Sequence, residues 1–396
     1  MTLRNLISSR AGLRFLAAIG ALAGAGVARA QAPHVHRTDV FVAGQDGITE
    51  YRIPVLLTST KGTLLAFCDA RVKKPGDPPN YIKLVMKRST DGGATWGTLR
   101  TLVDPGEGQG AVADSCGLVD RQTGIIWVFS DYCPEGVGGG NARPGLTGAT
   151  VSYKAIKSDD DGLTWSVPID FTPMVKKPGW CAGSFGPGKG IQMRSGRLVF
   201  PRYYTDTSAR AEPSAEPPAV SFVVFSDDHG KTWQIGGETE THGNTNECQV
   251  VEAADGSLVL NMRGITGTHR KIARSTDGGQ TWGQVVEDRA LIEPRCQGSV
   301  EYLVGTDGHQ GHLLFSNPAS TRRENLTIRL SDDDGRTWPV ARQVYAGPAA
   351  YSCLSALPDG TAGCLYECGK ANPHEKISFV KFNVAWLTQG RASGSK

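Results

Sequence analysis

The stretch STDGGATW at residues 89–96 recurs, with small changes, four more times along the chain: SDDDGLTW at 158–165, SDDHGKTW at 226–233, STDGGQTW at 275–282 and SDDDGRTW at 331–338. Each copy of this S-x-D-x-G-x-T-W pattern, here termed a box, follows an apolar, alternating segment such as Ser221–Phe225. We therefore interpret each box as the turn of a β-hairpin, in which the Asp accepts backbone N–H bonds, the Gly takes a positive φ and the Trp packs beside the hairpin. Because near-identical turns imply a shared structural task, we do not expect metal binding or catalysis from these acids.

The spacing of the boxes predicts an all-β fold, a six-bladed β-propeller of four-stranded antiparallel blades. Successive boxes start 49 to 69 residues apart, which suits one blade per box. Residues 31–396 divided among six blades give about 61 residues each, so five blades carry a box and one does not. We expect the alternating segment Ser378–Trp386 to pair with an early strand near Val40–Val42 and close the ring. No linker marks a second domain, so residues 31–396 are expected to form one.

Residues 1–30 differ in composition from the rest of the chain. Three arginines at 4, 10 and 14 precede the apolar run Phe15–Val27 and the sequence Ala28-Arg29-Ala30. This pattern predicts a secretory signal cleaved after Ala30, and hence a secreted or periplasmic protein; the alternative, a membrane anchor, is disfavoured because so short a run spans a bilayer poorly. No later segment is apolar enough to span.

Charge and cysteine content exclude several classes of function. Without residues 1–30, which hold four arginines and no acid, 38 lysines and arginines face 39 acidic side chains. This balance gives no indication of binding to nucleic acid or to a membrane surface. The nine cysteines form no C-x-x-C pair and no Cys/His run with zinc spacing, so we expect no metal site. In an exported protein cysteines can pair, and the odd number leaves at least one free or intermolecular; the sequence does not give the pairing.

Outside the boxes, several short segments concentrate arginines, acids and a tyrosine. They are YRIP at 51–54, Asp69-Ala70-Arg71 followed by Asp77, NECQVVE at 246–252, LNMR at 260–263, R-x-N-L-T-x-R at 323–329 and AYS at 350–352. Together with the boxes, they resemble the exo-α-sialidases, also called neuraminidases, over nearly all of residues 31–396. The resemblance implies a propeller in which three arginines bind the substrate carboxylate, a Tyr paired with a Glu is the nucleophile, and an Asp is the acid/base.

The resemblance assigns the carboxylate-binding arginines to Arg52, Arg263 and Arg323. Arg322 competes with Arg323, and the spacing to Asn325 decides for Arg323. Independently, sialic acid carries a carboxylate on its anomeric carbon, and guanidinium groups hold carboxylates through paired, charge-assisted hydrogen bonds. We predict that the three arginines converge from different blades on the end of the ring opposite the box turns.

Two further residues support this set. Arg71 resembles the family's additional active-site arginine, which precedes the acid/base on the same loop. Glu367 in LYECG matches a family acid that orients one of the three arginines, and a fixed carboxylate behind clustered cations is also physically expected.

The resemblance assigns the catalytic groups to Tyr351 as nucleophile, Glu247 as the base that activates it, and Asp77 as acid/base. A neutral phenol avoids the repulsion that a carboxylate nucleophile would meet at a carbon already bearing a carboxylate. Around Asp77 the chain reads D-P-P-N-Y-I-K-L-V where the family often shows D-x-G-D-I-D-L-V. This departure leaves Asp69 as an alternative acid/base.

The resemblance implies an exo-α-sialidase that removes terminal sialic acid, with retention, from glycoproteins, glycolipids and oligosaccharides. One alternative is a propeller that binds sialylated glycans without cleaving them; such a binder needs the arginines but not Tyr351, Glu247 and Asp77. The other is a sialic-acid transferase or a hydrolase of a related nonulosonic acid. No cofactor is expected, and the sequence does not indicate an oligomeric state.

Overall fold

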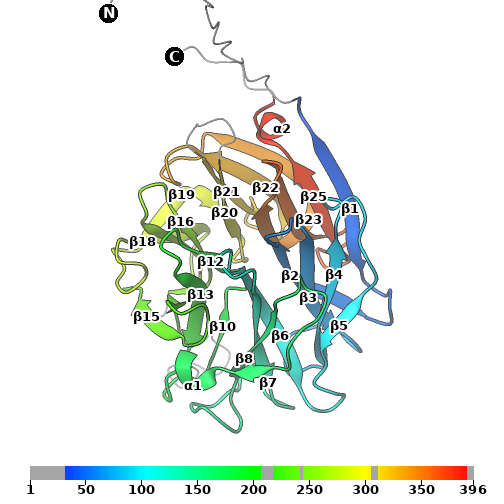
Figure 1. Cartoon of the computed structure of the whole chain (residues 1–396), viewed down its shortest axis with the longest axis vertical. Coiled ribbons are helices and arrows are strands. Elements are labelled where there is room, and N and C mark those ends of the chain that lie inside the picture. The colour runs from blue at the N-terminus through cyan, green and yellow to red at the C-terminus, as the bar shows by residue number, and fades with distance from the viewer. Residues whose placement is uncertain (1–31, 207–217, 241–243, 305–310, 390–396) are drawn as a thin grey trace, which may run out of the picture. The chain divides into compact units, whose positions relative to one another are not determined.

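The structure is a computed structural model that describes residues 32–206, 218–240, 244–304 and 311–389. The predicted signal segment, residues 1–30, lies outside the described residues. The all-β prediction is confirmed: strands dominate the described residues, and the helices there are two short ones, α1 (Thr172–Val175) and α2 (Val384–Thr388). Figure 1 shows the strands of residues 32–389 following one another in chain order, from blue and cyan through green and yellow to orange and red.

The first large sheet contains nine strands and holds the first two boxes. Its main path runs β2 (Glu50–Thr58), β3 (Leu64–Arg71), β4 (Ile82–Ser89), β6 (Ala111–Val119), β7 (Ile126–Cys133), β8 (Ser152–Ser158) and β9 (Ile169–Asp170). β5 (Arg100–Val103) pairs with β4, and β11 (Gly188–Lys189) pairs with β6. A single pair, Ile82 with Ala111, joins β4 to β6 in parallel, so two antiparallel groups meet there.

Two smaller sheets hold the third and fourth boxes. One runs β10 (Ala182–Phe185), β13 (Leu198–Thr205), β14 (Ala219–Ser226) and β15 (Gln234–Glu238), with β12 (Ile191–Gln192) paired to β13. The other is a four-stranded meander of β16 (Thr245–Glu252), β17 (Leu258–Gly264), β18 (His269–Ser275) and β19 (Val286–Ile292).

The last sheet joins the two ends of the described chain. Its order is β1 (Val35–Val42), β25 (Lys376–Phe382), β24 (Ala362–Cys368), β23 (Val340–Ala356), β22 (Glu324–Ser331), β21 (His312–Pro318) and β20 (Ser299–Leu303). β1 runs antiparallel to β25, with Val42 opposite Lys376, so the expected pairing of an early strand with the last one is confirmed. The expected bounds of that strand are wrong, because the side chain of Asn383 accepts a hydrogen bond from the Trp386 backbone N–H at 2.8 Å and begins α2.

The boxes are turns, as predicted. In the first, Asp91 accepts hydrogen bonds from the Thr95 backbone N–H (3.0 Å), the Thr95 hydroxyl (2.6 Å) and the Ser89 hydroxyl (2.7 Å), and the other four boxes repeat this set. These bonds hold the pKa of Asp91 down at about 2. Gly93 has a φ of +88°, and a Cβ there would lie 2.1 Å from the ring of Phe379, so both backbone and space require glycine.

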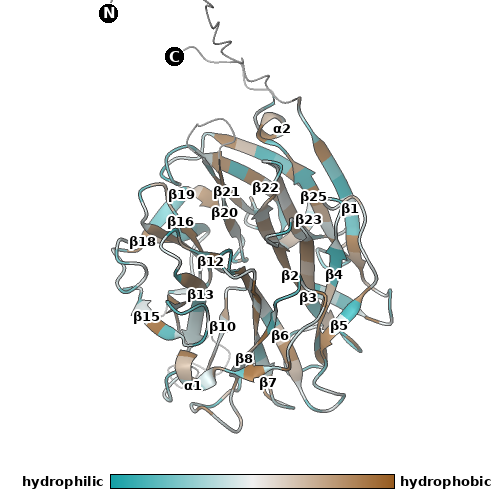
Figure 2. Cartoon of the chain, in the orientation of Figure 1, coloured by the Kyte–Doolittle hydropathy of each residue, from teal (hydrophilic) through white to brown (hydrophobic). Residues whose placement is uncertain are grey.

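The core lies between neighbouring sheets. Figure 2 shows hydrophobic residues concentrated in the strands of residues 32–389. Between β7 and the sheet that contains β10, β14 and β15, Phe129 stacks on Phe185 with 4.5 Å between ring centroids and meets Trp233 edge-on. All nine cysteines are free and buried. None of the nine forms a disulfide, and they pack as small apolar side chains in the interior.

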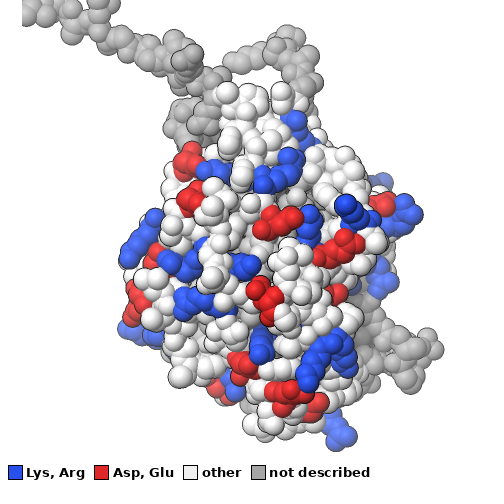
Figure 3. Space-filling view, turned by 90° about the vertical axis from the view of Figure 1, so that its right-hand side faces the viewer, with Lys and Arg blue, Asp and Glu red and all other residues white. Residues whose placement is uncertain are grey.

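The surface on the right of Figure 1 carries mixed charge. Figure 3 shows lysine and arginine side chains interspersed with aspartate and glutamate over this face, which includes β1, β4 and β5. Such a surface lacks the single-sign patch that binding to a polyanion requires. None of the helices in the described ranges is long and apolar enough to cross a membrane.

Candidate active site

One cleft of about 440 Å³ gathers most of the residues singled out in the sequence. Its lining includes Arg52, Asp77, Glu247, Arg263, Arg323 and Tyr351. Their backbones belong to different parts of the fold: β2, the segment between β3 and β4, β16, β17, the segment before β22, and β23. Arg71 and Glu367 lie behind this lining as buried supports. The eight residues therefore form one connected site.

Glu367 on β24 connects Arg52 to Tyr351. Its side chain is fully buried; one carboxylate oxygen accepts from the Arg52 Nε at 2.6 Å and the Ile53 N–H at 2.8 Å, and the other accepts from the Tyr351 N–H at 3.0 Å. Ile53 has a φ of +61°, at a point where the pairing of β2 with β3 shifts register. The Glu367 carboxylate raises the pKa of Arg52 further above its ordinary value, although burial opposes this. The pair therefore places a permanently charged guanidinium in the cleft.

Tyr351, Glu247 and Arg263 form a hydrogen-bonded triangle. The Tyr351 hydroxyl donates to one oxygen of Glu247, and Arg263 Nη1 donates to the other at 2.9 Å and to the Tyr351 hydroxyl at 3.3 Å. Burial, with the Glu247 charge second, raises the pKa of Tyr351 well above its usual value, and Arg263 and Arg323 partly oppose the rise. The phenol therefore rests protonated, beside a carboxylate positioned to take its proton.

The other two arginines flank the same tyrosine. The guanidinium carbons of Arg52 and Arg323 lie 5.1 and 5.6 Å from the centre of the Tyr351 ring. Arg323 Nη2 reaches the carbonyl of Arg295 at 3.5 Å. Arg322, the competing candidate, is paired with Glu324 at 2.9 Å and is 79% exposed in its side chain. Arg323 is therefore the one of the two that enters the cleft.

Asp77 stands at the rim of the cleft. Arg71 on β3 donates one guanidinium nitrogen to Glu50 at 2.8 Å and another to Asp77. The Asp77 side chain is 78% exposed, whereas that of Arg71 is buried. The alternative acid, Asp69, is buried within β3, where it accepts the Asp114 N–H at 3.3 Å, and it is not part of the cleft lining. Access to the cleft thus favours Asp77.

The sequence reasoning missed four polar residues of the cleft: Asp114, Asp131, Tyr203 and Thr205. Asp114 has a φ of +50°, at a register shift in the pairing of β6 with β7. Burial, with the charges of Asp77 and Glu247, raises its pKa to about 7. Asp131 is an acid inside the apolar strand β7, and burial raises its pKa well above the usual range. The position of an acid within an apolar segment could have singled out Asp131 in the sequence. The sequence around Asp114 gave no such indication.

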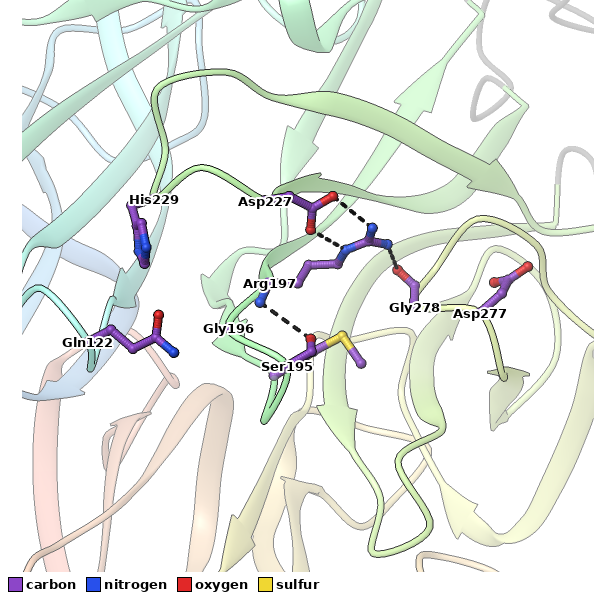
Figure 4. A pocket seen from close by; sticks show the side chains of 9 residues that line it. Gln122, Ser195, Gly196, Arg197, Asp227, His229, Asp277 and Gly278 are labelled. Atoms are coloured by element: carbon purple, nitrogen blue, oxygen red, sulfur yellow. Dashed lines mark hydrogen bonds and ion pairs between the residues drawn. The ribbon is translucent and has the colours of Figure 1, made fainter.

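A second cavity, of about 480 Å³, lies among the box turns (Figure 4). Its lining includes Asp227, His229 and Asp277, and it shares no residue with the cleft. The Arg197 guanidinium donates hydrogen bonds to the Asp227 carboxylate at 2.7 Å and to the Gly278 carbonyl at 3.0 Å. The His229 ring contacts the Asp120 carboxylate at 2.8 Å. The charged side chains Arg197, Asp227 and His229 therefore have partners within the protein. This indicates that they stabilise the fold at this cavity.

Metal ligands are not grouped in the part of the chain that the structure describes: no three His, Cys, Asp or Glu side chains are placed there to hold an ion. The cationic groups that face the cleft are Arg52, Arg263 and Arg323. Guanidinium groups bind carboxylates through fixed, paired donors, so the cleft is suited to a small anionic substrate.

The chain is similar to known proteins both in sequence and in structure. Residues 82–364 match the model of a family described as "BNR repeat-like domain". The sialidase of Micromonospora viridifaciens is 40% identical over 93% of this chain and 56% of its own length, and that of Bacteroides fragilis is 38% identical over 85% and 64%. The chain thus spans less than two thirds of these relatives. The solved structure of Hadza microbial sialidase Hz136 matches with a TM-score of 0.81 and 35% identity, over 89% of this chain and 69% of that one.

Proposed function

The chain belongs to the sialidase family, and from this we propose that it is an exo-α-sialidase that hydrolyses terminal sialic acid from glycoconjugates with retention of anomeric configuration. The observation that carries the proposal is the Tyr351–Glu247 pair, which lies in one cleft with Arg52, Arg263 and Arg323. A protein that only bound sialylated glycans would use the arginines and have no use for an activated phenol.

In the proposed first step, the three arginines hold the substrate carboxylate and present the anomeric carbon to Tyr351. The Tyr351 oxygen forms a bond to that carbon while its proton passes to Glu247. The bond from the anomeric carbon to the glycosidic oxygen breaks, and Asp77 donates a proton to that oxygen, so the aglycone leaves as an alcohol. The product of this step is a covalent aryl glycoside, in which the anomeric carbon is bonded to the Tyr351 oxygen.

In the proposed second step, water replaces Tyr351. Asp77, now ionised, takes a proton from water, whose oxygen bonds to the anomeric carbon, and Glu247 returns its proton to the departing Tyr351 oxygen. Two displacements at one carbon give net retention. A transferase would differ only in using a sugar hydroxyl in place of water, so the same residues would serve that alternative.

We further propose that the sheets form the six blades of a propeller. The pairings support groups of β2 to β5, β6 to β9, β10 with β13 to β15, and β16 to β19. The long strand β23 contributes its first half to β20, β21 and β22, and its second half to β24, β25 and β1. A secreted or periplasmic location also remains a proposal, supported by the basic and apolar pattern of residues 1–30.

The test is incubation with a fluorogenic aryl α-sialoside, with proton NMR of the released sugar. We expect dye release and the α-anomer of free sialic acid as the first product, before it mutarotates. Binding of the sialoside without dye release would favour the non-cleaving binder, and a β-anomer as first product would contradict the double displacement.

A further inference from the structure

A buried ion pair lies beside the end of β17 that carries Arg263. Arg270 on β18 and Glu293, which directly follows β19, are 0% and 1% exposed, and Arg270 Nη1 lies 2.7 Å from a Glu293 carboxylate oxygen. Neither residue lines the cleft, and the proposed chemistry uses neither. Two charges are costly to remove from water, and an apolar pair of similar size often stabilises a fold equally well. The other hydrogen bonds of the pair indicate a task besides stability.

These hydrogen bonds hold the backbone on both sides of Arg263. Arg270 Nε donates to the side-chain oxygen of Asn261 at 2.7 Å, and its Nη2 donates to the Asn261 backbone carbonyl at 3.3 Å. The second oxygen of Glu293 accepts the Gly264 N–H at 2.8 Å. Because Asn261 and Gly264 flank Arg263 in the chain, the ion pair fixes the backbone from which the Arg263 side chain enters the cleft.

The same ion pair holds a second segment, residues 295–297, here termed the strap. Arg270 Nη1 also donates to the Cys296 carbonyl at 2.8 Å. The preceding carbonyl, that of Arg295, faces Arg323 Nη2 at 3.5 Å. Arg295 has a φ of +54°, a conformation that residues with side chains seldom adopt, so its carbonyl is aimed by the surrounding contacts. The ion pair therefore influences a second arginine of the cleft through the strap.

The strap also contacts the strand that carries Tyr351. The Cys296 side chain belongs to the small buried cluster that contains Tyr351. The side-chain oxygen of Gln297 accepts the N–H of Ser352, the residue after Tyr351, at 3.0 Å, and its nitrogen donates to the Pro187 carbonyl at 3.2 Å. One short segment, tied to one ion pair, thus lies against both a proposed binding group and the proposed nucleophile.

We propose, on the basis of the function proposed above, that Arg270 and Glu293 are positioning residues for carboxylate binding. Their ion pair keeps the end of β17 and the strap in one arrangement, and so directs Arg263 and Arg323 toward the substrate carboxylate. Guanidinium groups hold a carboxylate through donors in a fixed geometry, so small displacements of the backbone behind them weaken these bonds. Both residues act through the arginines, because neither lines the cleft.

The experiment compares two non-hydrolysable, sulfur-linked α-sialosides that differ only at C1, one with the carboxylate and one with a carboxamide. Calorimetry gives Kd for each with the full chain, and the ratio of carboxamide Kd to carboxylate Kd measures what the charge contributes to binding. We expect a ratio of about a hundred in the wild type. The double variant Arg270→Met with Glu293→Leu, apolar and of similar size, should fold and lower the ratio about tenfold.

Two further variants complete the test. Glu293→Gln keeps the shape of the side chain, but its single oxygen cannot accept from both Arg270 and the Gly264 N–H, so the ratio should fall about threefold; it serves if the double variant fails to fold. Arg88→Met is the control, because it removes a cation that pairs with Asp161 in the second box at 2.9 Å, and neither of these residues lines the cleft. It should leave the ratio within about twofold of the wild type, even where urea unfolding shows a loss of stability.

The outcomes separate the two proposals. A ratio that stays at the wild-type value in the double variant and in Glu293→Gln would overturn the positioning role and leave the sialidase function standing. A ratio that falls equally in Arg88→Met would also overturn it, because the effect would then follow general destabilisation. A wild-type protein that binds neither ligand and cleaves no aryl sialoside would overturn the proposed function, and the positioning role with it.

Discussion

Glu367 shows how single residues build this site. Its two carboxylate oxygens hold the Arg52 guanidinium and the backbone N–H groups of Ile53 and Tyr351, so one buried side chain fixes both a binding group and the proposed nucleophile. A charge this deep is tolerated only because each oxygen is paired. Removing it would leave Arg52 buried without its counter-charge, which explains why the acid belongs to the site although it does not line the cleft.

A pair of substitutions tests the proposed nucleophile, Tyr351, against a proposed binding group, Arg323. Tyr351→Phe should lower kcat by orders of magnitude and leave sialoside binding nearly intact, because the hydroxyl acts mainly in the transition state. Arg323→Ala should weaken binding as well, since it removes charge-assisted bonds to the substrate carboxylate. Steady-state kinetics with an aryl sialoside and calorimetric binding of a non-hydrolysable analogue measure both effects. Near wild-type turnover of Tyr351→Phe would mean that the nucleophile is misassigned.

Asp114 gives a prediction for stability against pH. Its pKa is raised to about 7 in the folded protein, mainly by burial, whereas the pKa of an Asp in an unfolded chain is about 3.9. The folded state therefore binds this proton more tightly than the unfolded chain does. The resulting stabilisation of the fold is fully present below the unfolded pKa and is lost as pH rises through the folded pKa of about 7. Relative to Asp114→Asn, which has no such proton, the free energy of unfolding of the wild type should fall between about pH 4 and pH 7, by at most about 1.4 kcal/mol per pH unit.

Urea unfolding of both proteins over this pH range measures the difference. A difference between wild type and Asp114→Asn that stays constant with pH would show that the carboxyl of Asp114 titrates in the folded protein as it does in the unfolded chain.

At the scale of elements, the box turns are the best-predicted feature. Their Asp, Gly and Thr contacts are local in sequence, so the pattern alone specifies them. The end of the last strand was not predictable in the same way. The alternating segment continues to Trp386, but the Asn383 side chain caps α2, so the final residues of the segment are helical. A single side-chain hydrogen bond to the backbone can thus favour a helix start over continuation of a strand.

The second box offers a test with an internal control. Asp160→Ala removes the acceptor of the Thr164 N–H (2.8 Å), the Thr164 hydroxyl (2.6 Å) and the Ser158 hydroxyl (2.8 Å). We expect the melting temperature to fall by about 2–5 °C, with activity per folded molecule unchanged. Asp159→Ala, next to it in the same turn, removes none of these bonds and should change the melting temperature by no more than about 1 °C. Equal shifts in the two variants would contradict a structural role for the third box position.

At the scale of the whole molecule, the sequence predicted the all-β class and the pairing of β1 with β25, but not the full site. The family resemblance pointed to the arginines and Tyr351 through the short motifs that contain them, and the structure brings these side chains into one cleft. Asp131 gave a signal as an acid within an apolar strand, but the place of Asp114 and Asp131 in the site could not be assigned. It depends on neighbours from other strands: the charges of Asp77 and Glu247 act on Asp114, and the charge of Asp114 acts on Asp131. The free cysteines have the same explanation: pairing depends on distances that the spacing of cysteines does not encode.

The proposal that Tyr351 attacks the anomeric carbon is tested most directly by trapping the adduct. A 3-fluorosialosyl fluoride has a good leaving group and a second fluorine that slows hydrolysis of the glycosyl adduct, so the intermediate should accumulate. Peptide mass spectrometry of the treated protein should locate one sialyl label on Tyr351, and Tyr351→Phe should remain unlabelled. A label on Glu247, Asp77 or any other residue, or full turnover without any adduct, would contradict the mechanism.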